Sequence, residues 1–499
     1  MKPFRIFIFF LLVCGLLLGL SFVFPDEGVS LGREMKLRFI TSTDLFASDS
    51  TISHYTDSLI KSAILMDDPE WDMSDSEIPS VNSNSTTYSD STTYLTAEPG
   101  RTVNNDSLVR ERIVRIRGRV YPLEATDRAI GNLVRFFRLA EQAGEKGELV
   151  RILHYGDSQI ENDRMTALLR YRLQKVFGGS GCGMVPAIPL YSGNPVFREN
   201  YSGDWTRYTG FGRRDSTLGH NNYGMMACFT AVPPAWEGSL PSLEFAFKAG
   251  KRASQFSALR LYIHSYADSG MVVVHFNDTI TDTVRNIRDG YQELKWWPGF
   301  APGKVKLEFG LKAGGRIYGI GFDPDAGVQV DNIAMRGSSG LEFSRFDWEL
   351  MYTMFTALNP GMIVMQFGGN VVPYIEYPSS YKRFFKRELK FMKRLCPDAA
   401  IVVIGPADMS RKENGRFVTW ESLEPVRDAL REAALESDCA FWDMYGAMGG
   451  ENSMQNFVLA DPPLAIPDYI HFTPRGANLM AGMFFDAVML EYEKYRAGQ

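Results

Sequence analysis

The chain has 499 residues, of which 45% are hydrophobic and 22% are charged, and its formal net charge is −6. This length exceeds one ordinary domain, and the composition is that of a folded globular protein. The slightly acidic balance, without a strong basic run, excludes nucleic acid as an expected partner.

The first feature along the chain is an uncharged apolar segment, residues 6–24, which basic residues precede and acidic residues follow. A helix of this length spans roughly 28 Å, close to the thickness of a bilayer's hydrocarbon core, and the charge asymmetry orients the rest of the chain outward. We therefore expect residues 1–24 to be an anchor in the inner membrane and the body of the protein to be extracytoplasmic, in the periplasm or cell envelope. The alternative is a cleaved signal peptide and a secreted protein, although the apolar run is long and no Ala-x-Ala site follows it.

The next two segments separate the anchor from the globular part. Residues 25–66 read as a membrane-proximal segment with some helical periodicity. Residues 67–110, which include SVNSNSTTYSDSTTY, are rich in Ser, Thr, Asp and Asn and poor in large aliphatic residues. Because such a composition buries too little apolar surface to fold alone, we expect a flexible linker there.

Helical and strand patterns alternate once the globular part begins at about residue 111. The spacing of apolar residues predicts a helix over 125–144, and ELVRILHY (148–155) has the continuous apolar character of a buried strand. The segment 160–179 is predicted to be a helix that ends in glycines. A strand, a tight turn and a helix in this order begin an α/β unit.

The middle of the chain, residues 196–327, has a different pattern. Short β-type runs such as SLEFAFKA, ALRLYIHSY, MVVVHFND and KVKLEFGL are separated by Gly, Pro, Asp and Asn, with little helical periodicity. This spacing predicts an antiparallel β-sandwich or a jelly roll.

Alternation of strands and helices returns after residue 328. We predict three strands, 362–370, 399–407 and 440–445, and three helices, 380–396, 423–437 and 473–495. The simplest architecture is one α/β domain, formed by residues 111–195 and 328–499, that is interrupted by the β-rich insertion.

Ser158 lies where the strand of the first α/β unit meets the following helix, in GDSQ. A serine becomes a nucleophile only when a base accepts its proton and a third group orients that base. Of the six histidines, only His471 lies near the C-terminal end of the α/β part with an aspartate, Asp468, three residues before it. An isolated D-x-x-H is more often a capping Asp beside a surface His, but its uniqueness here favours a catalytic pair.

Acyl transfer also needs hydrogen-bond donors for the developing oxyanion. Gly337, in VDNIAMRGSSG, offers an unshielded backbone N–H, and Asn370, in VMQFGGNVV, offers a side-chain amide. Each segment alone is also compatible with an ordinary turn at the end of a strand.

Taken in order, HYGDSQ, NIAMRGSSG, GGN and DYIH resemble the four conserved blocks of the SGNH/GDSL hydrolase superfamily. The resemblance covers the α/β part, about half of the chain, and implies a flavodoxin-like three-layer α/β/α fold with a parallel sheet. It implies a triad of Ser158, His471 and Asp468, an oxyanion hole made by Ser158, Gly337 and Asn370, and ester chemistry without a metal or cofactor. The sequence departs from the family pattern where Gln159 follows the serine and Val371 follows the asparagine.

These features predict a serine esterase that removes acyl groups, acetyl above all, from a cell-envelope or extracellular polysaccharide. An O-acetyltransferase with the same triad is one alternative, and an envelope protein that binds glycan without catalysis is another. Trp296 and Trp297 of the insertion are candidates for stacking on sugar rings, although such aromatics more often pack in a core.

Four cysteines follow the apolar segment: Cys182, Cys228, Cys396 and Cys439. They allow three complete disulfide pairings, which sequence cannot distinguish. Buried free thiols are favoured because a core of this size does not need disulfides. The chain has neither a CxxC nor an HExxH motif, so no metal site is predicted.

Overall fold

The computed structural model describes residues 29–30, 36–37, 120–190, 194–235, 239–277, 280–460 and 462–498. The predicted anchor (1–24) lies outside these residues, as do the linker (67–110) and all of the membrane-proximal segment except two short strands, β1 (Val29–Ser30) and β2 (Lys36–Leu37). Within the part of the chain that the structure describes, no helix is both long enough and apolar enough to span a bilayer.

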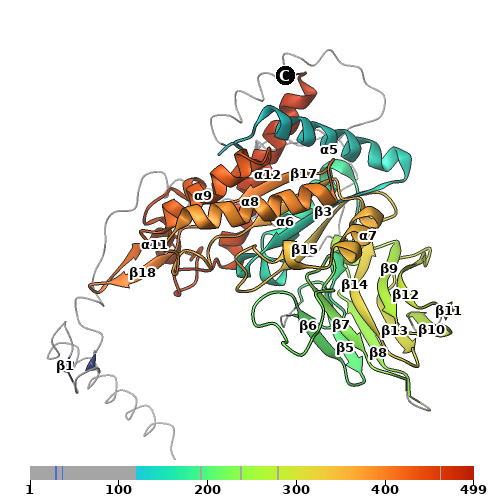
Figure 1. Ribbon diagram of the computed structural model, residues 1–499. Helices are drawn as coiled ribbons and strands as arrows, with labels where there is room; N and C mark the ends of the chain where they lie inside the picture. The colour runs from blue at the N-terminus through green and yellow to red at the C-terminus, as the bar shows by residue number, and fades with distance from the viewer. Residues whose placement is uncertain are drawn as a thin grey trace, which may run out of the picture.

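A five-stranded parallel sheet forms the centre of the α/β part (Figure 1). Its strand order is β15-β3-β16-β17-β20, and every neighbouring pair is parallel. These strands are nearly continuous apolar runs because both faces of the sheet are covered. Their bounds are β3 (Leu149–Gly156), β15 (Gly327–Ala334), β16 (Met362–Gln366), β17 (Ala400–Ile404) and β20 (Ala440–Trp442).

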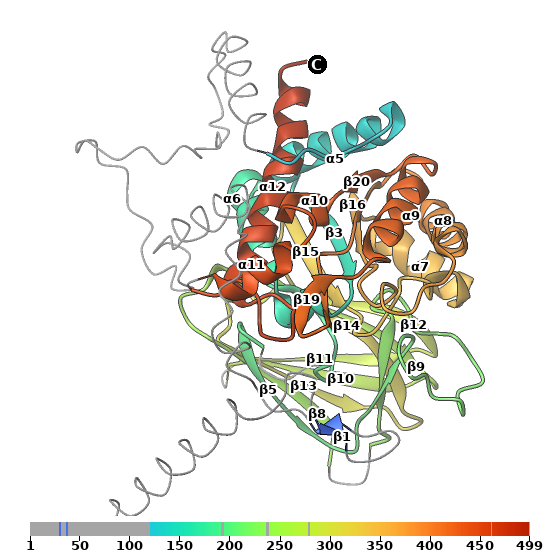
Figure 2. The ribbon, with the colours of Figure 1, turned by 90° about the vertical axis from the view of Figure 1, so that its left-hand side faces the viewer.

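Helices cover both faces of this sheet, which gives three layers (Figures 1 and 2). One face packs Ile152 against α5 (Asp127–Lys146), α6 (Thr166–Phe177) and α12 (Pro474–Arg496). The opposite face packs Leu153 against α7 (Trp348–Leu358), α8 (Pro378–Leu395) and α9 (Leu423–Leu435). Neighbouring side chains of a strand point to opposite faces, so one apolar strand serves both cores. The predicted α/β/α architecture is confirmed.

Two local predictions need correction, and a hairpin and a short helix were missed. The helix predicted over 160–179 begins only at Thr166, because a 3₁₀ segment, η2 (Ser158–Asp163), and left-handed residues precede it. The strand predicted over 440–445 ends at Trp442, because the Asp443 side chain accepts a hydrogen bond from the Gly446 N–H and caps α10 (Met444–Met448). A hairpin of β18 (Ser410–Glu413) and β19 (Arg416–Thr419) and the short helix α11 (Ser453–Leu459) were not predicted.

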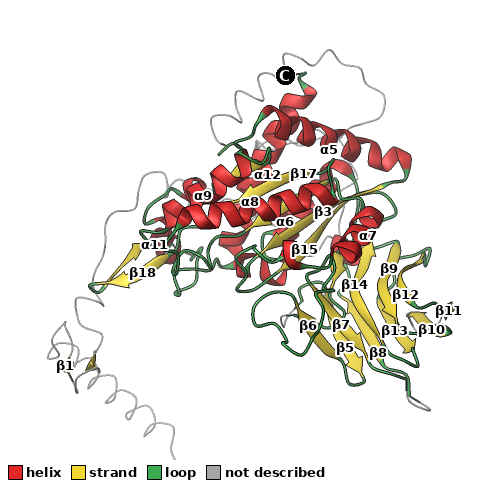
Figure 3. Cartoon of the chain, in the orientation of Figure 1, coloured by secondary structure: helices red, strands yellow, loops and turns green. Residues whose placement is uncertain are grey.

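The insertion consists of two antiparallel sheets that pack face to face, as predicted for a sandwich (Figure 3). One sheet has the order β11-β10-β13-β8-β5, and the other has the order β12-β9-β14-β7-β6 with β4 added on β14. Alternate apolar residues such as Val272, Leu261 and Phe322 fill the space between the sheets. Strand β4 lies before the predicted boundary at residue 196 yet pairs with β14. The strands are β4 (Gly183–Val185), β5 (Phe197–Ser202), β6 (Thr206–Thr209), β7 (Cys228–Val232), β8 (Ser242–Phe247), β9 (Ala258–Ser265), β10 (Gly270–Phe276), β11 (Ile280–Ile287), β12 (Gly290–Trp296), β13 (Lys304–Gly310) and β14 (Gly315–Asp323).

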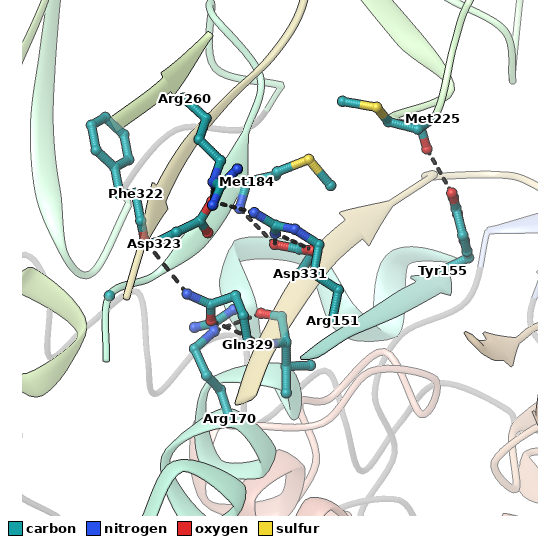
Figure 4. Close-up of polar contacts among 12 residues, drawn as sticks. Arg151, Tyr155, Arg170, Met184, Met225, Arg260, Phe322, Asp323, Gln329 and Asp331 are labelled. Carbon is teal, nitrogen blue, oxygen red and sulfur yellow. Dashed lines mark hydrogen bonds and ion pairs between the residues drawn. The ribbon is translucent and has the colours of Figure 1, made fainter. Parts of the chain in front are cut away.

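A buried ionic network joins the insertion to the parallel sheet (Figure 4). Arg151 of β3, only 2% exposed, pairs with Asp331 of β15 at 2.7 Å and with Asp323 of β14. Arg260 of β9 also contacts Asp323, at 3.1 Å, and the Met184 N–H of β4 donates to Asp331 at 2.7 Å. Because these charges are shielded from water, they depend on one another for compensation. The network therefore fixes the insertion against the parallel sheet.

The four cysteines, Cys182, Cys228, Cys396 and Cys439, are buried free thiols, as favoured from the sequence.

Candidate active site

The register of the parallel sheet brings the predicted site segments to one edge. Gly156, the last residue of β3, lies opposite Ala334 at the end of β15 and Gln366 at the end of β16. The segments that carry Ser158, Gly337 and Asn370 begin directly after these three positions. Carboxyl ends of parallel strands are where open α/β folds place their ligands.

The turn that carries Ser158 has no room for a larger residue before it. A Cβ on Gly156 would lie 2.9 Å from Ile160 Cδ1 and 3.2 Å from the Gln366 carbonyl oxygen. The Asp157 carboxylate accepts the Gln159 N–H at 3.0 Å, which caps the 3₁₀ turn that begins at Ser158. The close approach and the cap together direct the chain sharply away from the strand, with Ser158 at the turn.

The structure brings Ser158, His471 and Asp468 into one hydrogen-bonded line. Ser158 Oγ lies 2.8 Å from His471 Nε2, and His471 Nδ1 lies 2.6 Å from Asp468 Oδ2. Since the carboxylate accepts from Nδ1, the proton of the neutral ring is on Nδ1, and Nε2 is free to accept the serine proton. This is the relation between nucleophile, base and orienting acid that acyl transfer requires.

Asp468 is held as an ionised group. Burial raises the pKa of Asp468, but the backbone N–H and side chain of His471 and the Ile470 N–H donate to it, and these hydrogen bonds leave its pKa below the usual range. Oδ1 accepts the N–H groups of Ile470 at 2.9 Å and His471 at 3.0 Å, while Oδ2 contacts the imidazole. The aspartate thus fixes both the backbone and the ring of its partner.

The hairpin β18–β19 supports the turn that carries Asp468 and His471. Tyr469 has φ +58° and its ring stacks on Phe417 of β19, with ring centroids 3.5 Å apart. The Ser410 N–H of β18 donates to the Tyr469 carbonyl at 3.0 Å. A left-handed tyrosine is unfavourable in isolation, so these contacts hold a conformation that the turn alone would not keep.

Asn370 and Gly337, the other two oxyanion candidates, lie in the segments next to the turn that carries Ser158. Asn370 Nδ2 donates to the Ser338 carbonyl at 3.0 Å and is 3.4 Å from Asp157 Oδ2, so the amide joins all three segments. Gly337 has φ +76°, and no atom lies within 4 Å of the position that a Cβ would occupy. An open, left-handed glycine leaves its backbone accessible, which suits its predicted role as a donor.

Asp157 was not singled out from the sequence, although it touches the site. Burial raises its pKa to about 6, despite the Gln159 hydrogen bond and the proximity of His471, which lower it.

Gln159, where the sequence departs from the family pattern, makes a contact between two segments of the site. Its side-chain amide donates to the Ile470 carbonyl at 2.6 Å and so ties the serine turn directly to the histidine turn. A leucine at this position could not make that bond.

Arg164 is a further supporting residue that sequence reasoning missed. Its guanidinium donates to the Ser158 carbonyl at 2.8 Å and to the Glu161 carbonyl at 3.1 Å. Glu161 in turn pairs with Arg336, the neighbour of Gly337. The Glu161–Arg336 pair joins two loops that are distant in the sequence, so no local sequence signal indicates it.

The other histidine of the α/β part, His154, is buried and does not compete with His471. His154 Nε2 is 3.0 Å from Gln366 Oε1, and burial lowers the pKa of His154 to about 4, partly offset by that hydrogen bond. It lies inside β3, fully enclosed.

The two tryptophans proposed for sugar stacking differ in environment. Trp296 is 4% exposed and belongs to the core of the sandwich, so its ring is not available to a ligand. Trp297 is 62% exposed. The structure therefore leaves only Trp297 as a candidate of this pair.

A cavity of about 80 Å³ lies where the insertion meets the α/β part. Its lining includes Asp163 at the end of η2, Asn332 of β15, and Glu199 of β5. Burial raises the pKa of Glu199 to about 7. The insertion thus approaches the segment that directly follows Ser158.

Comparison with known proteins shows the fold. No family model and no curated protein matches the sequence. A solved structure of a peptidoglycan O-acetylesterase is 20% identical, with a TM-score of 0.60, and the match covers 74% of this chain and 98% of that one. A putative GDSL-like lipase from Parabacteroides merdae is 18% identical, with a TM-score of 0.27, and the match covers 33% of this chain and 74% of that one. A family two carbohydrate esterase from Clostridium thermocellum is 14% identical, with a TM-score of 0.22, and the match covers 57% of this chain and 97% of that one.

The first of these likenesses is the one close enough to show a shared fold. The match covers 74% of this chain, which is more than the α/β part alone. This shared fold agrees with the α/β/α architecture that the resemblance of the four motifs implied.

Proposed function

We propose that this chain, which has the SGNH/GDSL hydrolase fold, is a serine esterase that removes acyl groups, acetyl in the simplest case, from a cell-envelope or extracellular polysaccharide. One observation carries the proposal: the line from Ser158 Oγ through the imidazole of His471 to Asp468, with contacts of 2.8 and 2.6 Å. Such a line has the geometry of a nucleophile with its base and orienting acid.

The reaction follows from this geometry in two steps. His471 Nε2 accepts the proton as Ser158 Oγ attacks the ester carbonyl. The Ser158 N–H, the Gly337 N–H and the Asn370 amide, which gives up its 3.4 Å contact with Asp157 Oδ2, stabilise the oxyanion. The imidazolium then protonates the sugar oxygen as its bond to the acyl carbon breaks, so the sugar departs as an alcohol and an acyl-serine remains. Water, deprotonated by the same imidazole, attacks the acyl-serine, the carboxylic acid departs, and Ser158 regains its proton.

Three observations support a glycan ester as the substrate. The structure that shares this fold is named for acetyl removal from peptidoglycan. The apolar residues 6–24 and their flanking charges favour an enzyme outside the cytoplasm, either anchored or secreted. Trp297 offers an exposed ring on the insertion.

The test is acetate release by the full-length protein from an aryl acetate, from acetylated xylan and from O-acetylated peptidoglycan. We expect Ser158-dependent release, so that Ser158→Ala lowers the rate by at least about 10³-fold. Equal rates for the two proteins would overturn the triad assignment. Release that occurs only when a glycan acceptor is added, with the acyl group recovered on that acceptor, would identify an O-acetyltransferase instead. Binding of glycan without any turnover would identify a non-catalytic binder.

A further inference from the structure

Two tyrosines beside the catalytic edge are unusually exposed. Tyr374 and Tyr377 follow β16, in the segment VVPYIEY, and are 84% and 67% exposed. These are the two highest exposures among the strongly exposed large hydrophobic side chains of the described residues. An aromatic ring turned toward water forgoes the burial that usually accounts for its presence.

The segment that carries these rings is firmly held. Val371 and Val372 are buried, and their N–H groups donate to the Gly368 carbonyl at 2.9 and 3.2 Å. The Ser422 hydroxyl donates to the Val372 carbonyl at 2.5 Å. Ile375, between the two tyrosines, packs against the core. The backbone is therefore ordered before any ligand arrives, and binding to the rings costs little additional conformational entropy.

The two tyrosines also belong to a segment next to the one that carries Ser158. Strand β16 is the direct neighbour of β3, and the two run parallel, so the segment after β16 borders the segment that carries Ser158. Tyr374 is four residues beyond Asn370, which limits the distance between their Cα atoms to about 15 Å. An extended polymer whose ester is at Ser158 can therefore reach the rings with its next units.

We propose that Tyr374 and Tyr377 form a platform on which a glycan stacks the sugar units beside the acylated one. Tyrosine suits this role because its flat apolar face matches the C–H face of a pyranose ring while its hydroxyl remains in water. Glu376, exposed between the two rings, provides an acceptor for sugar hydroxyls and disfavours an anionic group. The expected ligand is therefore a run of neutral sugar units.

The proposal rests on the proposed function and deepens it, because it makes the activity of the enzyme depend on the length of the glycan substrate. Small esters do not reach the platform, whereas oligosaccharides do. The double variant Tyr374→Ala/Tyr377→Ala should consequently lose activity toward long substrates and retain it toward short ones.

The experiment uses the full chain and three kinds of probe: an aryl acetate, and the acetylated mono- and oligosaccharides of the xylan, chitin or peptidoglycan type that the wild type deacetylates fastest. We expect the wild-type kcat/KM to rise with chain length and the double variant to lose about tenfold on the oligosaccharides, with no change on the aryl acetate. Tyr201→Ala, which removes a half-exposed tyrosine of β5 in the insertion, is the matched control and should behave as wild type.

Each other outcome overturns the platform. A wild-type rate that is independent of chain length, or a double variant that matches wild type on oligosaccharides, shows that the rings bind no sugar. An equal loss on the aryl acetate shows that the tyrosines act on the catalytic geometry instead. Absence of Ser158-dependent turnover on every probe would be a failure of the proposed function itself, and is distinguished by the Ser158→Ala comparison.

Discussion

Replacing Asp157 by Asn removes a carboxyl group that is 4% exposed beside the nucleophile. Burial raises the pKa of this carboxyl from the ordinary value of 3.8 to about 6. Below about pH 4 the group is largely protonated in both the folded and the unfolded chain, so it makes little difference to stability. Between pH 4 and 6 the unfolded chain loses the proton while the folded chain keeps it, and stability falls as pH rises.

The size of this effect follows from the shift. A difference of about two pKa units corresponds to about 3 kcal/mol, most of it developing between pH 4 and 6. For a chain of this length, the entropy of unfolding is on the order of 1 kcal/mol per kelvin, so the effect amounts to about 2–3 °C in Tm. Asp157→Asn has no such titration and should avoid this loss.

The assay is calorimetric melting of the wild type and Asp157→Asn at pH 4 and pH 8. The substitution also disturbs the contact with Asn370, but that cost is the same at both pH values and cancels in the comparison. We expect the Tm of the variant, relative to wild type, to be about 2–3 °C higher at pH 8 than at pH 4. A Tm difference that is independent of pH would refute the claim that the fold holds a carboxyl of raised pKa at this position.

Three further substitutions test the site and the junction. Asp468→Asn should lower kcat on an aryl acetate by about 10⁴-fold with KM little changed, since the imidazole loses its orienting anion; a loss below tenfold would contradict that role. Asn370→Ala should lower kcat by about 10²–10³-fold, and an unchanged kcat would remove the amide from the oxyanion hole. Arg151→Met should destabilise the protein by about 3–5 kcal/mol, measured by urea denaturation, because Asp323 and Asp331 would remain buried without their cation; a neutral effect would mean that the network does not hold the junction.

The parallel sheet could be predicted from the sequence because its strands are buried on both faces. MIVMQ has no polar residue before its final Gln366, and AIVVI has none at all, so neither run suggests an exposed face. Where the prediction failed, a local hydrogen bond or a left-handed residue decided the structure. Asn162, Asp163 and Met165 all have positive φ and delay α6, and the ion pair of Asp163 with Arg170, at 2.6 Å, supports this course.

The candidate triad could also be predicted, because Asp468 and His471 are three residues apart and no other histidine has that arrangement in the C-terminal part. The contacts that hold these two residues in place could not be predicted. The amide of Gln159 reaches the Ile470 carbonyl across 311 positions of the chain, and Phe417 stacks on Tyr469 from a separate hairpin. Such contacts depend on how distant segments pack, and a single sequence carries no periodic signal for them.

The most direct test of the central claim is covalent modification of Ser158. The full-length protein is treated with phenylmethylsulfonyl fluoride, and the site of modification is mapped by mass spectrometry while residual aryl acetate hydrolysis is measured. We predict one adduct, on Ser158, whose extent equals the loss of activity, and far slower labelling in His471→Ala because the base is absent. Full activity with Ser158 modified, or inactivation through a different residue, would contradict the assignment of Ser158 as the nucleophile.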